Sequence, residues 1–315
     1  MDPSFAMVFP GQGAQSIGMM NALAARFPQV AQRYEEASSA LNFDLWRLVS
    51  EGPSETLNQT QFTQPALLAA SVATWDAWLA EGGAVPCVLA GHSFGEYSAL
   101  VCAGALPFTA AIELVAARGR FMQEAVPSGA GAMAAVLGLD ANALNEVCAQ
   151  AAGAEVVACA NLNAPGQIVI SGNVGAVARA GELAKAAGAK RVIPLAVSVP
   201  AHCRLMEPAA ERYAQMVERV EVSAPRIPVI HNVDVMPHTA SHDIKRALIA
   251  QLSKPVRWQE TMLKFAELGI KKIGECGPGK VLVPLIRRCS SELATFSLNT
   301  PDELAAALTD FKAGG

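Results

Sequence analysis

The clearest chemical signal in the sequence is a serine held between two glycines. Gly91-His-Ser93-Phe-Gly95 has the G-x-S-x-G spacing, follows the apolar run 85–90 and precedes a segment with a helical pattern. A strand, a sharp turn and a helix in that order form a nucleophile elbow, which exposes the serine hydroxyl. Side chains at both glycine positions would collide in such a turn. We therefore predict that Ser93 is a nucleophile, against the alternative that an ordinary turn contains the pentapeptide by chance.

A nucleophilic serine needs a general base, and His202 has the best position among the five histidines. It follows the apolar segment 192–197 and Pro200, where the chain is expected to return to the larger body beside a cleft. His92 adjoins the nucleophile inside the turn, which should direct its side chain elsewhere. The remaining histidines are more typical of structural or solvated positions: His231, His238 and His242.

The sequence offers no clear acidic partner for the base. A serine hydrolase with this elbow would place an Asp or Glu at a strand end before its histidine. Between Ser93 and His202, acidic residues such as Glu113, Glu124 and Asp140 fall in helical or helix-capping contexts. We therefore expect a Ser–His dyad in which a backbone carbonyl orients the imidazole.

Two backbone N–H groups are candidates for an oxyanion hole. The N–H of Phe94 lies where the helix after Ser93 begins, and a helix N-terminus favours negative charge. Gln12, in the turn Phe9-Pro-Gly-Gln12-Gly13 after the first apolar run, could place a second N–H at the same edge of a sheet. An ordinary strand-to-helix turn explains the Gln12 pattern equally well.

A second glycine-rich segment resembles a phosphate-binding loop. Gly274-Glu-Cys-Gly-Pro278-Gly-Lys280 follows an apolar strand and precedes a helix. However, Val281 stands where a Ser or Thr would hold magnesium, and Pro278 lacks the N–H that a phosphate cradle needs. We interpret the segment as a tight turn and not as a nucleotide site.

The elements that must position these residues follow an α/β pattern. The chain has 315 residues, of which 52% are hydrophobic and 17% charged, which is typical of a compact globular protein. Short apolar strands alternate with helical patterns, so the sequence predicts a mainly parallel sheet in a large α/β-hydrolase-like body. The clearest elements before residue 126 are strands at 6–9 and 85–90, a helix that begins at Pro65, and helices at 96–103 and 109–124.

The middle of the chain predicts an inserted subdomain. Its elements alternate as strand 133–139, helix 142–152, strands 156–160 and 167–171, helix 174–187 and strand 192–197. This βαββαβ order is that of a ferredoxin-like fold. We therefore assign residues 127–199 to a small subdomain and residues 1–126 and 200–315 to the body. The body resumes with a helix to about 220, a strand at 228–231, helices near 244 and 260, a strand at 272–275 and a further helix.

Charge, hydropathy and cysteine spacing exclude several classes of protein. The net charge of −4 argues against general nucleic-acid binding. No apolar run is long enough to span a membrane, and the N-terminal residues lack the features of a secretory signal, so we expect a cytoplasmic protein. Seven scattered cysteines without a C-x-x-C pair predict neither a disulfide framework nor a structural zinc site.

The candidate residues lie in longer segments that resemble the malonyl-CoA:acyl carrier protein transacylases, the stand-alone malonyltransferases of fatty acid biosynthesis. The resemblance runs nearly end to end. It is carried by Phe9-Pro-Gly-Gln-Gly13, Thr63-Gln-Pro-Ala-Leu67, Gly91-His-Ser-Phe-Gly-Glu-Tyr-Ser98, Asn163-Ala-Pro-Gly-Gln-Ile-Val-Ile-Ser-Gly172, Ser198-Val-Pro-Ala-His202, Gln251-Leu-Ser-Lys-Pro-Val-Arg-Trp258 and Glu275-Cys-Gly-Pro-Gly-Lys280.

The resemblance implies a role for each catalytic candidate. Ser93 would be the nucleophile, His202 its general base, and the Gln251 backbone carbonyl would orient the imidazole. The backbone N–H groups of Gln12 and Phe94 would form the oxyanion hole. The implied reaction is ping-pong transfer of a malonyl group from malonyl-CoA to the phosphopantetheine thiol of acyl carrier protein, without a metal or redox cofactor.

The resemblance also implies the acyl-binding residues. Arg118 would pair with the malonyl carboxylate, whereas its sequence context alone suggests a helix-surface cation. Gln64 and Asn163 match polar positions that line the cleft. Phe94 replaces the more usual leucine and Ala201 a common serine, and both are expected near the acyl pocket.

Two matters stay open at the level of sequence. An acidic carrier protein would need a local basic rim, for which ordinary solvated charges are an equally good explanation. The candidates are Lys185, Lys190, Arg191, Lys280, Arg287 and Arg288. The alternative functions are a serine esterase or thioesterase on the same elbow, and a non-catalytic scaffold that binds acyl carriers.

Overall fold

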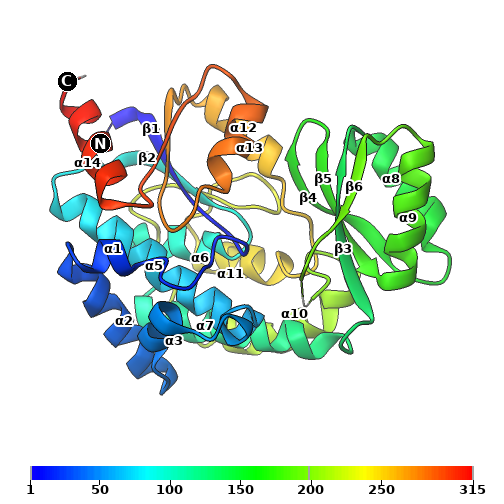
Figure 1. Ribbon diagram of the computed structural model, residues 1–315, viewed down its shortest axis with the longest axis horizontal. Coiled ribbons are helices and arrows are strands. Elements are labelled where there is room, and N and C mark those ends of the chain that lie inside the picture. The colour runs from blue at the N-terminus through cyan, green and yellow to red at the C-terminus, as the bar shows by residue number, and fades with distance from the viewer. Residues whose placement is uncertain (1, 198, 314–315) are drawn as a thin grey trace.

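Two β-sheets of different kinds organise the chain. The computed structural model describes residues 2–197 and 199–313, which form a larger body and a smaller lobe (Figure 1). The body holds a five-stranded parallel sheet in the order β7-β2-β1-β8-β9, and the lobe holds a four-stranded antiparallel sheet. The predicted α/β class, with a parallel sheet and a ferredoxin-like addition, is confirmed.

The parallel sheet is buried on both faces. Its strands are β1 (Asp2–Phe9), β2 (Pro86–Gly91), β7 (Val229–Ile230), β8 (Lys272–Glu275) and β9 (Ala294–Ser297). The alternate side chains of β1 enter two separate cores: Phe5, Met7 and Phe9 pack in one, and Ala6 and Val8 in the other. Helices on both sides explain why these strands are continuous apolar runs without alternation.

Helices of the body cover the two faces of this sheet (Figure 1). They are α1 (Asn21–Ala24), α2 (Pro28–Leu41), α3 (Leu45–Glu51), α4 (Ser54–Leu57), α5 (Thr60–Ala80), α6 (Gly95–Cys102), α7 (Phe108–Ala125), α10 (Glu207–Val217), α11 (Ser241–Ala250), α12 (Trp258–Glu267), α13 (Leu282–Cys289) and α14 (Pro301–Ala313), with a short 3₁₀ turn at Arg204–Met206. Helix α5 belongs to the first core, whereas α12 and α13 contribute to the second.

Helix α5 corrects one prediction from the sequence. The helix was expected to begin at Pro65, but it begins at Thr60, so the proline lies inside it and removes one backbone hydrogen bond. Burial of the first turn offsets that loss, since Thr60, Thr63 and Gln64 are all buried. A Cβ on Gly119 of α7 would lie only 2.6 Å from the Thr60 carbonyl oxygen, which shows how closely the two helices approach.

The lobe has the connectivity expected of a ferredoxin-like fold. Its elements are β3 (Gly131–Leu137), α8 (Ala141–Ala152), β4 (Val157–Ala164), β5 (Gln167–Asn173), α9 (Val174–Ala186) and β6 (Arg191–Pro194). The strands lie in the order β4-β5-β3-β6 and pair antiparallel throughout. Strand β6 ends at Pro194, earlier than the sequence predicts, and residues 195–197 leave the sheet to line the cleft.

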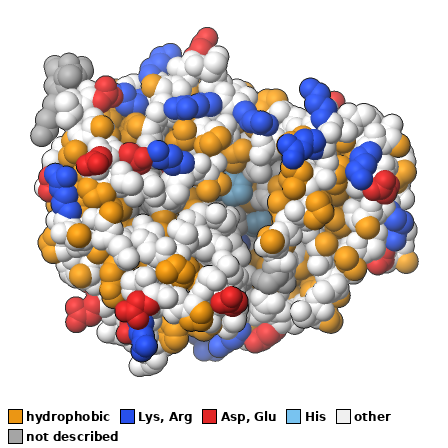
Figure 2. Space-filling model, in the orientation of Figure 1, with side chains coloured by type: hydrophobic (Ala, Val, Ile, Leu, Met, Phe, Trp, Pro, Cys, Tyr) orange, Lys and Arg blue, Asp and Glu red, His pale blue; other side chains and the backbone are white. Residues whose placement is uncertain are grey.

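The lobe is joined to the body by backbone hydrogen bonds as well as by its two connections. The Val256 N–H donates to the Ala160 carbonyl, and the Leu162 N–H donates to the Val256 carbonyl, each over 2.9 Å. Figure 2 shows the hollow that remains between body and lobe, with histidine atoms at its floor. No helix within residues 2–197 and 199–313 is both long and apolar enough to cross a bilayer.

Candidate active site

The turn after β2 places Ser93 at the floor of the cleft in a strained conformation. Its φ of 54° lies in the left-handed region, which costs a non-glycine residue about 1–2 kcal/mol. Both flanking glycines are required by packing: a Cβ on Gly91 would lie 1.9 Å from the carbonyl carbon of Gly95, and one on Gly95 would lie 2.4 Å from the Phe9 oxygen. This is the geometry of a nucleophile elbow.

Asn232 secures the turn from a distant part of the chain. Its Oδ1 accepts a hydrogen bond from the Ser93 N–H over 2.7 Å, and its Nδ2 donates to the Gly91 carbonyl over 2.7 Å. The residue is fully buried. The strained turn is therefore held by a side chain that the sequence analysis did not identify.

His202 is the histidine that contacts the serine. Its Nε2 lies 2.7 Å from Ser93 Oγ, and its Nδ1 lies 2.8 Å from the Gln251 carbonyl oxygen. Because a carbonyl can only accept, the proton must reside on Nδ1, which leaves the Nε2 lone pair for the serine hydroxyl. His202 also has a positive φ, 62°, and its N–H donates to the Leu252 carbonyl over 3.0 Å.

The environment of His202 favours the neutral imidazole. Burial, followed by the positive charge of Arg118, lowers the pKa of His202 to about 3. The hydrogen bond to the Gln251 carbonyl opposes this shift but does not outweigh it. At neutral pH the imidazole is therefore ready to accept a proton from Ser93.

The other histidines do not contact Ser93 in the described part of the chain. His92 Nε2 donates to Asn163 Oδ1 over 2.8 Å, and His231 Nδ1 donates to Glu96 over 2.6 Å. The remaining two lie beside aspartates, at 2.8 Å for His238 and 3.4 Å for His242.

Ser93 and His202 open into a cavity of about 300 Å³. Gln12 also lines this cavity, and the Phe94 N–H lies at the N-terminal cap of α6. Neither N–H donates to another group within residues 2–197 and 199–313. An oxyanion hole requires backbone N–H groups that are not already bonded in this way.

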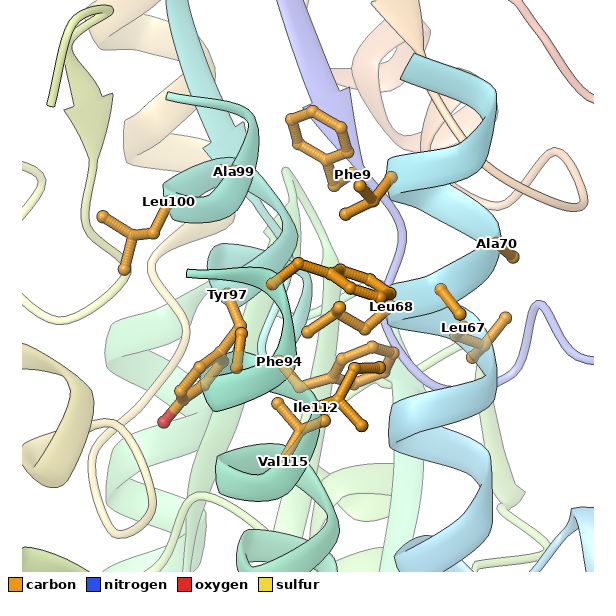
Figure 3. Close-up of a cluster of buried hydrophobic side chains, with 14 of the residues drawn as sticks. Phe9, Leu67, Leu68, Ala70, Phe94, Tyr97, Ala99, Leu100, Ile112 and Val115 are labelled. Atoms are coloured by element: carbon orange, nitrogen blue, oxygen red, sulfur yellow. The ribbon is translucent and has the colours of Figure 1, made fainter. Parts of the chain in front are cut away.

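The side chains of Phe94 and Ala201 have different surroundings. Phe94 belongs to the buried cluster with Leu68, Ile112 and Val115, so its ring extends into the core of the body and not into the acyl pocket (Figure 3). Phe94 thus adjoins Ser93 along the chain, but its ring does not line the cavity into which Ser93 opens. Ala201 does line the cavity, whereas Ser198 lies outside the described residues.

Arg118 is buried, in contrast to the surface position that its sequence context suggested. It is 1% exposed, and its guanidinium lies 6.0 Å from the Tyr97 ring. Its Nη2 donates to Gln251 Oε1 over 3.0 Å and lies 3.5 Å from Ser93 Oγ. Within residues 2–197 and 199–313 it forms no ion pair with a carboxylate, and its Nε has no hydrogen-bond partner. Such a guanidinium beside a nucleophile is suited to an anionic acyl group.

Gln64 and Asn163 line different cavities. Gln64 lines the cavity that contains Ser93, and its Oε1 has no hydrogen-bond partner among the described residues. Asn163 instead lines a neighbouring cavity of about 450 Å³ that shares Gln12 and His92 with the first. Asn161, which was not predicted from the sequence, lines both cavities.

The side chain of Gln251 and the carboxylate of Glu96 were also missed. Gln251 Nε2 donates to the Ser93 carbonyl over 2.9 Å and to Glu96 Oε2 over 2.8 Å. Glu96 stands in the first turn of α6. An acidic residue in an otherwise apolar, buried helix was the signal in the sequence that could have identified it.

The glycine-rich turn after β8 is occupied by a side chain of the protein itself. The Glu275 carboxylate accepts hydrogen bonds from the N–H groups of Val281, Leu282 and Val283, each over 2.9 Å. These are the donors at the start of α13 that a phosphate would otherwise use. The interpretation of this segment as a tight turn agrees with this geometry.

The six basic residues proposed for a docking rim differ in how they are bonded. Lys185 pairs with Glu182, and Lys280 with Glu303. Arg288 donates to Gln167 of the lobe over 2.8 Å, and Arg287 donates to Thr295 over 2.9 Å. Lys190 and Arg191 are exposed and form no ion pair within the described ranges. Figure 2 shows Lys and Arg side chains above the hollow.

Comparisons with known proteins agree with this geometry. The model of the acyl transferase domain family matches residues 6–295. The malonyl CoA-acyl carrier protein transacylase of Salmonella typhimurium is 51% identical over 305 residues, which cover 97% of this chain and 99% of the relative. That of Bacillus subtilis is 45% identical over 308 residues, which cover 98% and 97%.

Solved structures give the same result. The malonyl CoA-acyl carrier protein transacylase of Coxiella burnetii superposes with a TM-score of 0.96 at 51% identity and covers 97% of each chain. A malonyl-transacylase solved in complex with a type II polyketide synthase acyl carrier protein also has a TM-score of 0.96 at 51% identity, and covers 98% of this chain and 99% of that one.

Proposed function

The chain belongs to the acyl transferase domain family, and we propose that it transfers a malonyl group from malonyl-CoA to acyl carrier protein in fatty acid biosynthesis. The observation that carries the proposal is a serine–histidine pair 2.7 Å apart beside a buried guanidinium that forms no ion pair with a carboxylate of the described residues. The serine and the histidine would carry out the acyl transfer, and the guanidinium would select an acyl group that bears a carboxylate.

In the first half-reaction, Ser93 Oγ attacks the thioester carbonyl carbon while His202 Nε2 takes the hydroxyl proton. The carbonyl oxygen becomes an oxyanion that the N–H groups of Gln12 and Phe94 would bind. Loss of one such donor typically lowers the rate about 10²- to 10³-fold. The C–S bond then breaks, His202 returns the proton to the leaving sulfur, and CoA departs as a thiol from malonyl-Ser93.

The second half-reaction runs through the same groups in reverse. The phosphopantetheine thiol of the carrier protein gives its proton to His202 Nε2 and attacks the serine ester. The ester C–O bond breaks, and His202 protonates Ser93 Oγ. Each half-reaction requires an unprotonated imidazole at its start, which the lowered pKa of His202 provides. We propose that no metal or redox cofactor takes part, because every step is a proton or acyl transfer.

Arg118 would hold the far carboxylate of the malonyl group. A guanidinium can bind a carboxylate through two parallel hydrogen bonds, which fixes the ester in one orientation. An acetyl group would leave the buried charge unpaired. This positioning also favours thiol attack over hydrolysis, since both nucleophiles can reach an acyl-serine.

The geometry makes the two alternative functions less suitable. A serine esterase or thioesterase of this kind would orient its histidine with a carboxylate, whereas His202 Nδ1 contacts the Gln251 backbone carbonyl. A non-catalytic scaffold would not require a serine in a strained turn beside an unprotonated imidazole nitrogen.

We propose that the carrier protein docks against the body and the lobe together, through cations of which Lys190, Arg191 and Arg287 are exposed and can attract an acidic surface. The cytoplasm is the proposed location.

The direct test is to measure the intact mass of the protein after incubation with malonyl-CoA and then with the thiol form of acyl carrier protein. We expect one malonyl adduct, which the carrier protein removes, and no adduct on Ser93→Ala. An adduct that is lost to water faster than to the carrier protein would favour the thioesterase. A folded protein that is never acylated would favour the scaffold.

A further inference from the structure

The charge of Arg118 lacks a direct counter-ion in the free protein. The guanidinium is 1% exposed, and within the described chain it contacts the Gln251 amide oxygen, the Ser93 hydroxyl and Tyr97, none of which is a carboxylate. A buried charge without an opposite charge nearby strongly destabilises a folded protein. Something else in the site must therefore offset the positive charge.

The other charged group buried beside the nucleophile is Glu96, which is fully buried. Its Oε1 accepts a hydrogen bond from His231 Nδ1 over 2.6 Å. Its Oε2 accepts from the Asn232 N–H over 2.9 Å and from Gln251 Nε2 over 2.8 Å. Three donors and a position in the first turn of α6 all favour the ionised carboxylate.

His231 does not neutralise the negative charge of Glu96. Its Nε2 is buried and has no hydrogen-bond partner among the described residues. A neutral imidazole that donates through Nδ1 leaves only a lone pair unsatisfied there. An imidazolium would leave a charged N–H unsatisfied, which costs considerably more. The Glu96–His231 pair therefore carries a net charge of −1.

A single side-chain amide connects the two charges. Gln251 Oε1 accepts from Arg118 Nη2 over 3.0 Å, while Gln251 Nε2 donates to Glu96 Oε2. The amide dipole thus has its oxygen toward the cation and its nitrogen toward the anion, the orientation that both charges favour. Arg118 and Glu96 make no direct ion pair, but the Gln251 amide hydrogen-bonds to both of them.

We propose that Glu96 is a positioning residue that acts through Gln251 as the counter-ion of Arg118, and so sets how tightly the acyl pocket binds a carboxylate. The proposal rests on the proposed malonyl transfer for its kinetic part only. In the free enzyme Glu96 stabilises the unoccupied guanidinium. When a malonyl carboxylate arrives, it shares the charge of Arg118 with Glu96, so binding is weaker than it would be to an isolated cation.

Glu96→Gln tests the charge with little change in shape. The new amide can accept from Asn232 and Gln251 through its oxygen and donate through its nitrogen to His231 Nδ1, if His231 moves its own proton to Nε2. That tautomer has an unpaired N–H, which costs stability whatever stands at residue 118. A double-mutant cycle with Arg118→Met removes this common cost and isolates the coupling between the two charges.

The first measurement is the urea unfolding of the wild type, both single variants and the double variant. We expect Glu96→Gln to destabilise the protein more when Arg118 is present than when Met replaces it. If Glu96→Gln alone cannot be purified folded, a folded double variant supports the proposal, and an unfolded double variant contradicts it. Equal losses in both backgrounds would also overturn the proposal, because they would indicate a structural role.

The second measurement separates KM from kcat. For Glu96→Gln we expect the KM for malonyl-CoA to fall about threefold to tenfold and that for acetyl-CoA to stay unchanged. We also expect kcat to fall for both substrates, since the imidazolium of His202 loses a stabilising negative charge. An unchanged or raised KM for malonyl-CoA would contradict the proposal.

The matched control is Ser98→Ala, on the same helix, because Ser98 Oγ is buried without a hydrogen-bond partner among the described residues. It should leave both KM values and kcat unchanged. The two proposals fail in distinguishable ways: a wild type that transfers no malonyl group contradicts the proposed function, whereas the unfolding cycle needs no activity at all.

Discussion

The parallel sheet contains two glycine-rich turns of similar pattern that differ in how their backbone N–H groups are bonded. Strands β2 and β8 lie on either side of β1 and pair with it in parallel, so the turns that follow them emerge at the same edge. After β2, Ser93 stands in the turn, and the Phe94 N–H makes no hydrogen bond within residues 2–197 and 199–313. After β8, the Glu275 carboxylate takes three N–H groups at the start of α13.

The difference lies in where each turn places its buried carboxylate. Glu275 precedes its helix, so its carboxylate can accept hydrogen bonds from the N–H groups at the helix N-terminus, as a bound anion would. Glu96 follows the start of its helix and bonds instead to His231, Asn232 and Gln251. In the β2 turn the Ser93 N–H donates to Asn232, and the Phe94 N–H is the donor proposed for an oxyanion, whereas the Glu275 carboxylate caps the helix that follows β8. A glycine pattern alone does not distinguish these outcomes.

The largest effect should come from removing the Ser93 hydroxyl, the proposed nucleophile of the β2 turn. Ser93→Ala should lower malonyl transfer by about 10⁴-fold or more, because the covalent intermediate cannot form. The check is steady-state transfer to carrier protein, with folding verified by circular dichroism. If Ser93→Ala retained more than about a tenth of the activity, the β2 turn would not be the site of the reaction, and the contrast with the β8 turn would be lost.

The next effect concerns selectivity at the β2 turn. Arg118→Ala should reduce the preference for malonyl-CoA over acetyl-CoA by about 10²-fold, because the carboxylate loses its buried partner. The ratio of kcat/KM for the two substrates measures this directly. An unchanged ratio would exclude Arg118 from carboxylate recognition.

A change in the β8 turn should affect stability and not chemistry. Glu275→Gln replaces one acceptor oxygen with a donor that faces another N–H, which should cost about 1–3 kcal/mol in the free energy of unfolding. Urea denaturation measures the loss, and kcat/KM for the folded protein should stay within about twofold. A large loss of activity with unchanged stability would show that the β8 turn takes part in the reaction.

The buried base predicts a particular response to acid. The pKa of His202 is about 3 in the folded protein, against about 6.5 in an unfolded chain, so below pH 6.5 the unfolded state binds one more proton. The contribution of His202 to the free energy of unfolding is therefore constant above pH 6.5. As the pH falls from 6.5 toward 3, the free energy of unfolding decreases by up to about 1.4 kcal/mol per pH unit. The difference in unfolding free energy between His202→Gln and wild type should shift in the variant's favour by this slope between pH 6 and 4. A constant difference would contradict the lowered pKa.

The smallest expected effect is on the use of carrier protein, and it involves α13, the helix that follows the β8 turn. Arg287→Glu on α13, combined with Lys190→Glu on the lobe, should weaken use of carrier protein about threefold to tenfold through charge repulsion. The rate of acyl-enzyme formation from malonyl-CoA should not change. Equal losses in both half-reactions would argue against a docking rim.

Local patterns made the β2 turn predictable from the sequence. Its glycines, its serine and the flanking apolar runs all lie within a dozen residues, and the ferredoxin-like order of the lobe follows from successive elements. His202 was selected by its place at the end of the predicted insertion, although 109 residues separate it from Ser93. The predicted parallel sheet is confirmed, but strand β9 was not predicted, because it has only four residues and most of them are partly exposed.

The remaining features depend on tertiary contacts that a sequence does not display. Arg118 looks like a surface cation until α7 is packed, and only the family resemblance assigned it to the site. Asn232 and the Gln251 side chain meet the β2 turn from more than a hundred residues away. The first turn of α5 forms despite Pro65 because α7 covers it. In each case packing decided the outcome.

The most direct test of the acyl transfer account is to locate the malonyl group on the protein by peptide mass mapping after a brief exposure to malonyl-CoA. The account predicts an ester at Ser93 that forms in the absence of carrier protein and disappears when the carrier thiol is added. Malonyl attached at any other residue, or transfer that proceeds without a serine ester, would contradict it.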